Sequence, residues 1–185
     1  MQGLTKAELW IVLWKVDDLK QYGVLLIPKN RGPEQKFPLL LYMHGAAYGV
    51  PVHALPWLAD IAGEGYVIIG PALRGEDLFA GYGIPRELVF KCDGEIENLA
   101  GEVDDALAAV SAAKKLPYVA PGKFGVVGHS FGAGAGLLAA ARHPDTACVV
   151  SYDAWLVNPF RFYWDRVRRG ANNWLSWADF CNQPV

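Results

Sequence analysis

A serine between two glycines marks the segment Gly128-His-Ser-Phe-Gly132, which follows the apolar run 124–127. The G-x-S-x-G spacing is typical of a nucleophile held on a tight turn between a strand and a helix, because small residues two positions away on either side let the chain pack against itself. The first turn of such a helix directs backbone N–H groups and the positive end of its dipole at a developing oxyanion. The pattern therefore predicts that Ser130 is a nucleophile for acyl transfer.

Two other interpretations of this segment compete with a nucleophile. In one, the serine merely caps the following helix. In the other, the glycines bind a nucleotide, since residues 134–139 match G-x-G-x-x-A and Asp153 ends the next strand. In the dinucleotide fingerprint, however, the glycines follow the strand directly, whereas Gly134 and Gly136 lie a turn into the helix, and no G-K-[ST] sequence occurs. We therefore expect Gly134 and Gly136 to permit close helix packing instead.

The elements that must position this serine alternate between strand and helix. Two antiparallel strands are expected first, and then four strands buried on both faces, at 8–16, 22–27, 37–43, 66–69, 124–127 and 147–152. Helices are expected at 54–63, 95–115 and 133–143. In the longest helix, the apolar side chains that recur at helical spacing should face inward, namely Leu99, Val103, Leu107 and Val110. Glu102 and Asp105 should face outward. The connection 77–94 is expected to cross the sheet edge. This alternation predicts an α/β fold, a mostly parallel sheet with helices on both faces.

Composition narrows the class of protein. A chain of 185 residues with 52% apolar and 19% charged residues fits a single domain over 1–185. The net charge of −2 and the lack of a basic run argue against a nucleic-acid partner. Three cysteines without paired spacing favour a cytoplasmic protein without a disulfide framework or zinc site. We expect no cofactor, no metal, no signal peptide and no membrane span.

Five segments carry a resemblance to a known family: 22–28, 37–45, 70–76, 101–107 and 128–132. In this order and spacing, the chain from about residue 8 to residue 153 resembles the prolyl oligopeptidase and dienelactone hydrolase branch of the α/β-hydrolases. The resemblance implies hydrolysis of a small-molecule ester or a peptide. It also implies that the backbone N–H groups of Ala46 and Phe131 form the oxyanion hole. Because dienelactone hydrolases proper use a cysteine nucleophile, Ser130 favours the peptidase and esterase side.

The partners of the serine are harder to find. In this fold the triad follows the chain order serine, acid, histidine, yet the segment after Ser130 contains no further strand for an acid and none for a histidine. His143 lies about 20 Å along the helix from Ser130, and His129 is expected to point to the other side of the turn. His44 is expected to shape its loop, and the alternative is that it acts as the base. His53 is expected to lie in a loop. Asp153 could be the acid or an ordinary strand-end aspartate.

The sequence therefore predicts a serine hydrolase domain that is incomplete at its C-terminus. It would lack the last strands and the triad histidine, so the chain is expected to be inactive or weakly active. Uncovered apolar surface, with exposed Trp155, Trp164, Trp174 and Trp177, would favour self-association. The alternative function is a non-catalytic binding module that keeps a hydrolase-like pocket.

Overall fold

A six-stranded sheet organises the protein, for which the computed structural model describes residues 4–45, 49–81 and 83–155. Its strand order is β1-β2-β5-β3-β7-β8, with bounds Ala7–Val16, Leu19–Pro28, Val67–Pro71, Phe37–Met43, Val119–His129 and Thr146–Tyr152 respectively. β2 pairs antiparallel with β1 and with β5, whereas β5, β3, β7 and β8 run parallel. The short strands β4 (Val50–Pro51) and β6 (Phe79–Ala80) form a separate parallel pair. The prediction of a mostly parallel sheet is confirmed.

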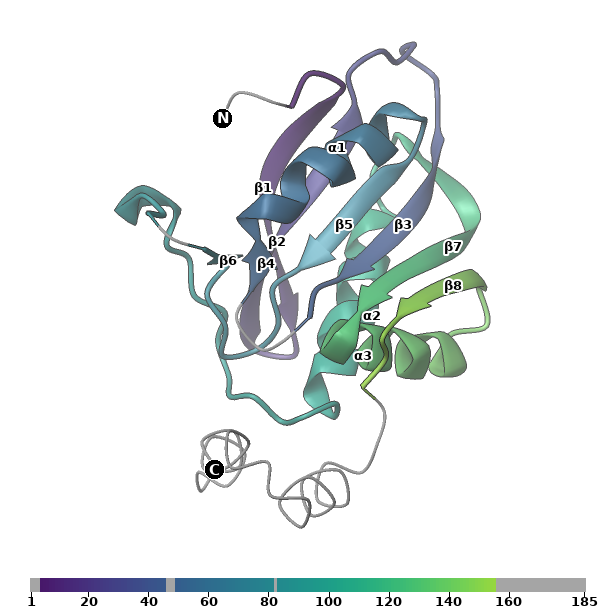
Figure 1. Cartoon of the computed structure of the whole chain (residues 1–185). Helices are drawn as coiled ribbons and strands as arrows, with labels where there is room; N and C mark the ends of the chain where they lie inside the picture. The colour runs from purple at the N-terminus through teal and green to yellow at the C-terminus, as the bar shows by residue number, and fades with distance from the viewer. Residues whose placement is uncertain (1–3, 46–48, 82, 156–185) are drawn as a thin grey trace. The chain divides into compact units, whose positions relative to one another are not determined.

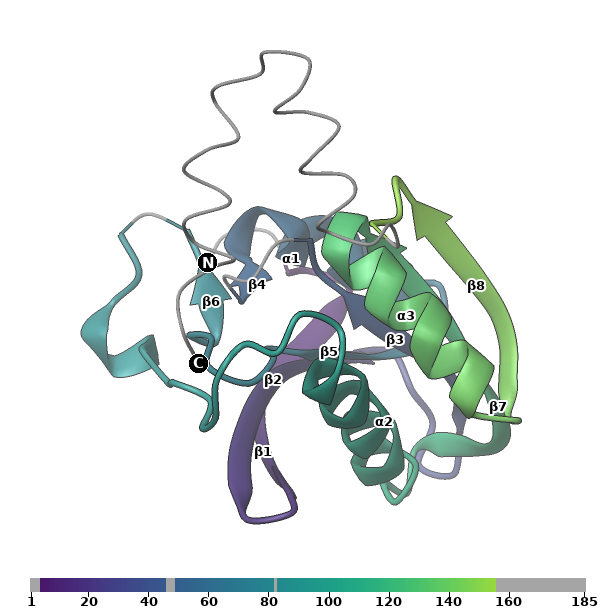
Figure 2. The same cartoon turned by 90° about the horizontal axis from the view of Figure 1, so that it is seen from below.

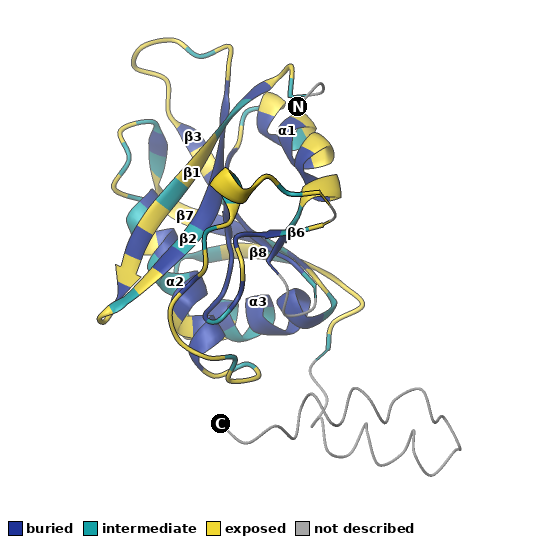
Figure 3. Ribbon diagram, turned by 90° about the vertical axis from the view of Figure 1, so that its left-hand side faces the viewer, coloured by how far each residue is buried: buried dark blue, intermediate teal, exposed yellow. Residues whose placement is uncertain are grey.

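Helices cover both faces of the sheet, as the sequence predicts. α1 (Leu55–Gly63) lies on one face, and α2 (Gly101–Ala113) and α3 (Ser130–Arg142) lie on the other (Figures 1 and 2). Because side chains alternate along each strand, the central strands contribute to two apolar clusters. Leu41, Met43 and Val126 belong to the cluster beside α2 and α3, whereas Tyr42 and Ile68 belong to the cluster beside α1. Figure 3 shows the buried central strands and the more exposed β1.

The longest helix differs from its prediction. α2 begins at Gly101 rather than near residue 95, because Asn98 and Leu99 have left-handed φ values of 54° and 80° that end helical geometry before it. Glu102 is buried instead of outward, and its carboxylate accepts hydrogen bonds from the backbone N–H groups of residues 97, 98 and 99. Burial raises the pKa of Glu102. The side chain thus ties the preceding loop to the start of the helix.

Asp105, also predicted to face outward, is fully buried against Arg74. Its carboxylate accepts hydrogen bonds from Arg74 Nε and Nη2 at 3.0 and 2.9 Å and from the Arg74 backbone N–H at 2.9 Å. Glu97 pairs with the remaining end of the guanidinium, and hydrogen bonding to Asp105 raises the pKa of Arg74. A Cβ on Gly101 would overlap this guanidinium, so a larger residue where α2 begins would displace Arg74 from Asp105.

The remaining elements depart from prediction at their ends or in their exposure. α3 begins at Ser130, three residues before its predicted start. β8 is largely exposed rather than buried on both faces, because it is the last strand in the described sheet; Val150 and Tyr152 are 59% and 70% exposed. The connection after β5 contains β6 and the 3₁₀ turn Arg86–Leu88.

Within the described residues, no helix is long and apolar enough to span a membrane.

The buried Arg74–Asp105 pair gives a test of the fold. Asp105→Asn leaves the guanidinium with one carboxylate partner, and breaking a buried pair costs about 3 kcal/mol of unfolding free energy. Asp104→Asn is the matched control, since Asp104 pairs with Arg142 on the surface at 3.1 Å; it should change the free energy by less than about 0.5 kcal/mol. Urea unfolding followed by circular dichroism measures both. Equal stability of the two variants would contradict this account of the pair.

Candidate active site

Ser130 occupies a strained turn at the junction of β7 and α3. His129 is the last residue of β7 and is extended, with φ −123° and ψ 136°, whereas Ser130 has a left-handed φ of 50°. This conformation costs a non-glycine residue about 1–2 kcal/mol. Such strain at a strand-to-helix turn is typical of a functional position. The prediction that the segment forms a nucleophile-type turn agrees with this backbone.

The two glycines of the segment are required by close packing. A Cβ on Gly128 would lie 2.6 Å from Ala133 Cα, inside the first turn of α3. A Cβ on Gly132 would overlap the main-chain carbonyl groups of Met43 and His44 at the end of β3. Gly132 therefore lets α3 start directly against β3. Gly136 serves the packing role expected from the sequence, because a Cβ there would lie 2.8 Å from Val126 Cγ1.

The backbone around Ser130 is tied to its neighbours. Phe131, a predicted oxyanion donor, is the second residue of α3, and its buried ring packs against Trp155 at a centroid distance of 5.8 Å. The Trp155 backbone N–H donates a 3.0 Å hydrogen bond to the Ser130 carbonyl. Trp155 is half-buried, so the prediction that it is unusually exposed is wrong; the other tryptophans of that prediction lie outside the described residues. Ala46, the second predicted donor, also lies outside them.

His44, at the end of β3, is buried beside Glu76. The distance from His44 Nε2 to Glu76 Oε2 is 3.1 Å, and both side chains are 1% exposed. The same Glu76 oxygen accepts a 3.0 Å hydrogen bond from the Leu73 backbone N–H. His44 Nδ1 lies 3.4 Å from the Gly45 carbonyl oxygen. These contacts join the segment after β3 to the segment after β5, in keeping with the loop-shaping role predicted for His44.

The other histidines have different surroundings. His129 stacks on Tyr152, with ring centroids 5.3 Å apart, and a Cβ on Gly45 would lie 2.7 Å from His129 Nδ1 and 3.2 Å from Ser130 Cβ. Gly45 thus lies against both residues, and the expectation that His129 points to the other side of the turn stays a prediction. His143 follows the far end of α3 and packs against Phe124. All four histidines are described, and within the described chain no hydrogen bond joins any of them to Ser130.

A pocket of about 510 Å³ opens at Ser130, on the α1 face of the sheet. Tyr42, Trp57 and Tyr152 line it with His53 and His129. Sequence reasoning missed this role for His53 and Tyr152. The alternation of side chains along β7 and β8 could have placed Tyr152 beside His129. Asp153, the predicted acid, follows β8 with a φ of 52° and is exposed.

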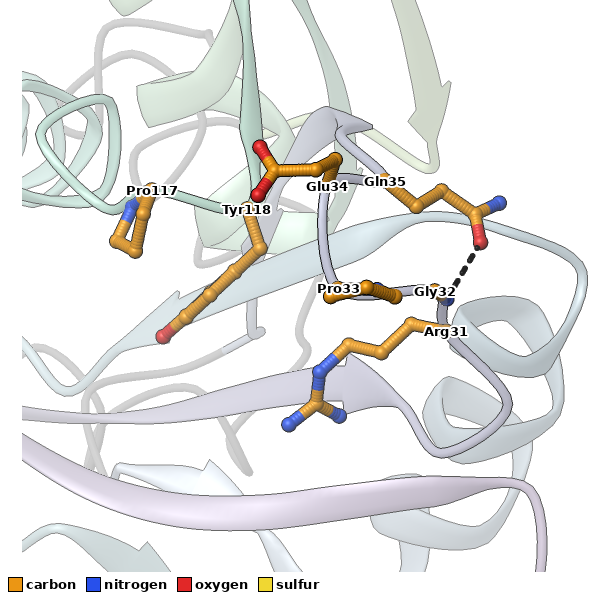
Figure 4. A pocket seen from close by; sticks show the side chains of 7 residues that line it. All are labelled: Arg31, Gly32, Pro33, Glu34, Gln35, Pro117 and Tyr118. Atoms are coloured by element: carbon orange, nitrogen blue, oxygen red, sulfur yellow. Dashed lines mark hydrogen bonds between the residues drawn. The ribbon is translucent and has the colours of Figure 1, made fainter.

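A smaller pocket lies at the opposite edge of the sheet. It has a volume of about 290 Å³ and is bounded by residues 31–35, before β3, and by 117–118, before β7 (Figure 4). Arg31 is already occupied there, because its guanidinium contacts Glu8 at 3.0 Å and lies 6.0 Å from the Tyr118 ring centroid. Ser130 belongs to the carboxyl ends of the parallel strands, where ligands bind in open α/β sheets.

Comparison with known proteins places this chain in a family. The sequence profile of the dienelactone hydrolase family matches residues 23–159. Among curated protein sequences, none matches this chain.

Solved structures show the same fold. Est1E from Butyrivibrio proteoclasticus, solved with bound ferulic acid, is 25% identical with a TM-score of 0.62, over 78% of this chain and 53% of that chain. An acylaminoacyl peptidase from Pyrococcus horikoshii is 17% identical with a TM-score of 0.61, over 82% and 24% of the two chains. An esterase from Pyrococcus furiosus is 18% identical with a TM-score of 0.62, over 82% and 50%. The chain thus spans between a quarter and a half of these proteins, and the predicted α/β-hydrolase fold is confirmed.

The strain at Ser130 predicts an unusual order of stabilities. Ser130→Gly and Ser130→Ala both remove the hydroxyl, but glycine adopts a left-handed φ without strain. We expect Ser130→Gly to be the more stable by about 0.5–1 kcal/mol, after the entropic cost of glycine is subtracted from the relieved strain. At Ser111, inside α2, the order should reverse by about 1 kcal/mol, because glycine disfavours a helix interior. Thermal unfolding of the four variants tests this, and the same order at both positions would refute the strain.

Proposed function

Because the chain belongs to the dienelactone hydrolase family, we propose that it is a serine hydrolase, which cleaves an ester or amide bond through an acyl-enzyme on Ser130. The left-handed backbone of Ser130 at the junction of β7 and α3 carries this proposal. The pocket at Ser130 provides space for a substrate beside the hydroxyl. A serine that only caps a helix accounts for neither feature, and the residue at the N-cap position of α3 is His129 rather than Ser130.

In the proposed reaction, Ser130 Oγ bonds to the carbonyl carbon of the substrate while its proton passes to a base. Negative charge collects on the carbonyl oxygen. Collapse of this intermediate breaks the bond to the leaving alcohol or amine, which takes the proton from the base. Water then attacks the acyl-enzyme, releasing a carboxylic acid and restoring the Ser130 hydroxyl.

We assign the oxyanion hole to the backbone N–H groups of Phe131 and Ala46. Support for Phe131 comes from its position in the first turn of α3, where N–H groups have no helical partner and the dipole favours negative charge. Support for Ala46 comes from its neighbour in the sequence, Gly45, which lies against Ser130. Asp153 is our candidate for the acid, because it follows β8 on the carboxyl edge of the sheet.

We propose that the base is a histidine outside these 185 residues. A base must come within about 2.6–3.2 Å of the hydroxyl, directly or through one water. His44 is held by Glu76, His129 is stacked on Tyr152, and His143 is at the far end of α3. His53 lines the same pocket as Ser130 and is the alternative base that the alanine variants below test. When a triad member is removed from a well-studied serine hydrolase, oxyanion stabilisation and substrate binding still accelerate the reaction roughly 1,000- to 10,000-fold over water. We expect no more than this from a chain without a base.

A binding module without catalysis is the second candidate function. The pocket at Ser130 favours it, because a ligand can occupy this space without any chemical step. The pocket would then hold a ligand that resembles the substrate of a hydrolase. The proposed substrate is a small-molecule ester or a peptide, consistent with the esterases and the peptidase that share the fold. The cytoplasmic location, the lack of nucleic-acid and membrane partners, self-association and the single domain over 1–185 stay predictions.

Covalent labelling tests the nucleophile. In the full-length protein, a fluorophosphonate probe should label Ser130, since phosphonylation uses the same activated hydroxyl as acyl transfer. Ser130→Ala should abolish the labelling, whereas Ser111→Ala should leave it unchanged. Mass spectrometry of the labelled peptide identifies the site. Labelling that persists in Ser130→Ala would disprove this assignment.

Turnover by residues 1–185 alone tests the origin of the base. We expect less than about one thousandth of the rate of a complete enzyme on a p-nitrophenyl ester series, because the hydroxyl has no proton acceptor. Alanine variants at His44, His53, His129 and His143 should each leave this low rate unchanged. Robust turnover that is lost both in Ser130→Ala and in one histidine variant would show that the chain carries its own base.

A further inference from the structure

Glu76 is a buried carboxylate that takes no part in the proposed reaction. Among the described residues, three carboxylates are buried, those of Glu76, Glu102 and Asp105. Glu102 and Asp105 hold the loop before α2 and the Arg74 guanidinium. Glu76 lies on the loop after β5 and faces the end of β3 instead. Because a carboxylate is costly to bury, its position beside the proposed site is informative.

The backbone of Glu76 is fixed by hydrogen bonds on both sides. Its N–H donates to the Leu73 carbonyl oxygen at 3.1 Å, and its carbonyl oxygen accepts a 2.9 Å hydrogen bond from the Cys92 N–H. Its side-chain Oε2 accepts a 3.0 Å hydrogen bond from the Leu73 N–H. The same oxygen lies 3.1 Å from His44 Nε2. Glu76 is therefore a rigid support for the His44 ring.

The contact with Glu76 also determines where the His44 ring carries a proton. A carboxylate oxygen accepts hydrogen bonds and does not donate them, so the nitrogen that faces it must carry the proton. In His44 that nitrogen is Nε2. Both side chains are 1% exposed, so water hardly competes for this contact. The His44 ring thus has one preferred orientation at the end of β3.

The main chain next to the His44 ring touches the turn that contains Ser130. A Cβ on Gly132 would lie 2.1 Å from the His44 carbonyl oxygen, so α3 begins directly against this residue. A Cβ on Gly45 would lie 3.2 Å from Ser130 Cβ. These contacts leave no free space, and a small displacement of His44 would therefore reach Ser130.

We infer that Glu76 is a positioning residue, which through His44 sets the position of the Ser130 hydroxyl. This inference rests on the proposed function, because the position of the hydroxyl matters for turnover only where a base takes its proton. A reacting atom that is misplaced by about 1 Å can lose roughly 100-fold in rate. Because the loss arises in the chemical step, it lowers kcat and leaves KM nearly unchanged.

Paired substitutions in the full-length protein, which supplies the base, test the inference. Glu76→Leu removes the carboxylate at a similar volume, whereas Glu76→Gln keeps an oxygen that accepts from His44 Nε2 and from the Leu73 N–H. Glu102→Leu is the matched control, since Glu102 is similarly buried and its carboxylate holds the loop before α2 rather than the end of β3. Turnover of the p-nitrophenyl ester series gives kcat and KM.

We expect Glu76→Leu to lower kcat at least about tenfold with KM within about twofold, because the hydroxyl shifts relative to the base. Glu76→Gln should keep kcat within about threefold, since the acceptor remains. Glu102→Leu should lower the unfolding temperature but keep the kcat of the folded protein within about twofold. If Glu76→Leu fails to fold by circular dichroism, Glu76→Asp replaces it. The shorter side chain withdraws the charge from His44 and should lower kcat more than Glu76→Gln does.

Nuclear magnetic resonance tests the same contacts without any reaction. The ring nitrogen resonances of His44 in the parent protein should show the proton on Nε2. The backbone amide resonances of Gly45 and Ser130 should shift in Glu76→Leu and stay in place in Glu102→Leu, because only the first change releases His44.

Two results would overturn the inference. One is a loss of kcat in Glu76→Leu that is no larger than in Glu102→Leu, and the other is a Ser130 amide resonance that does not move in Glu76→Leu. If the parent protein neither hydrolyses esters nor is labelled at Ser130, the proposed function fails. A shifted Ser130 resonance would then still show that Glu76 sets this turn, whereas an unmoved one would reject both.

Discussion

The close approach of α3 to the end of β3 is the constraint on which the site depends. Gly132 lies against the carbonyl groups of Met43 and His44 with no space for a Cβ, so the helix must begin immediately after β7. The chain can turn this sharply only if one residue takes a left-handed φ, and that residue is Ser130. Packing therefore fixes the serine at the carboxyl edge of the sheet and exposes its hydroxyl to the pocket, at the cost of local strain.

Buried charges hold the loops around this turn. Glu76 connects the loop after β5 to His44, whose backbone packs against α3. Two residues earlier, Arg74 connects the same loop to Asp105 in α2. Removing Asp105 is costly because the charge of Arg74 would remain buried. The short segment 73–76 thus couples helix packing on one face of the sheet to the position of the loop that borders Ser130.

Local patterns explain what the sequence could predict. The glycine spacing around Ser130 reflects packing within a few residues, and the apolar runs reflect strands buried on both faces, so both could be recognised without a structure. The helical period placed Asp105 outward because a charged residue is usually solvated. Its burial depends on Arg74, 31 residues away, and no local pattern contains that partner. The position of His129 likewise depends on Tyr152 from a neighbouring strand.

The two halves of a serine hydrolase site have different structural requirements. In the proposed site, presenting the hydroxyl and orienting the Phe131 N–H needs only the junction of β3, β7 and α3, whose geometry is set by glycine packing and the helix start. Proton transfer needs a side chain placed within about 3 Å of the hydroxyl, and such a side chain must be held by other elements. A chain can therefore keep the first half and its pocket whether or not the second is supplied. The proposed catalytic and binding functions differ by this one proton acceptor, while both depend on the same strained turn.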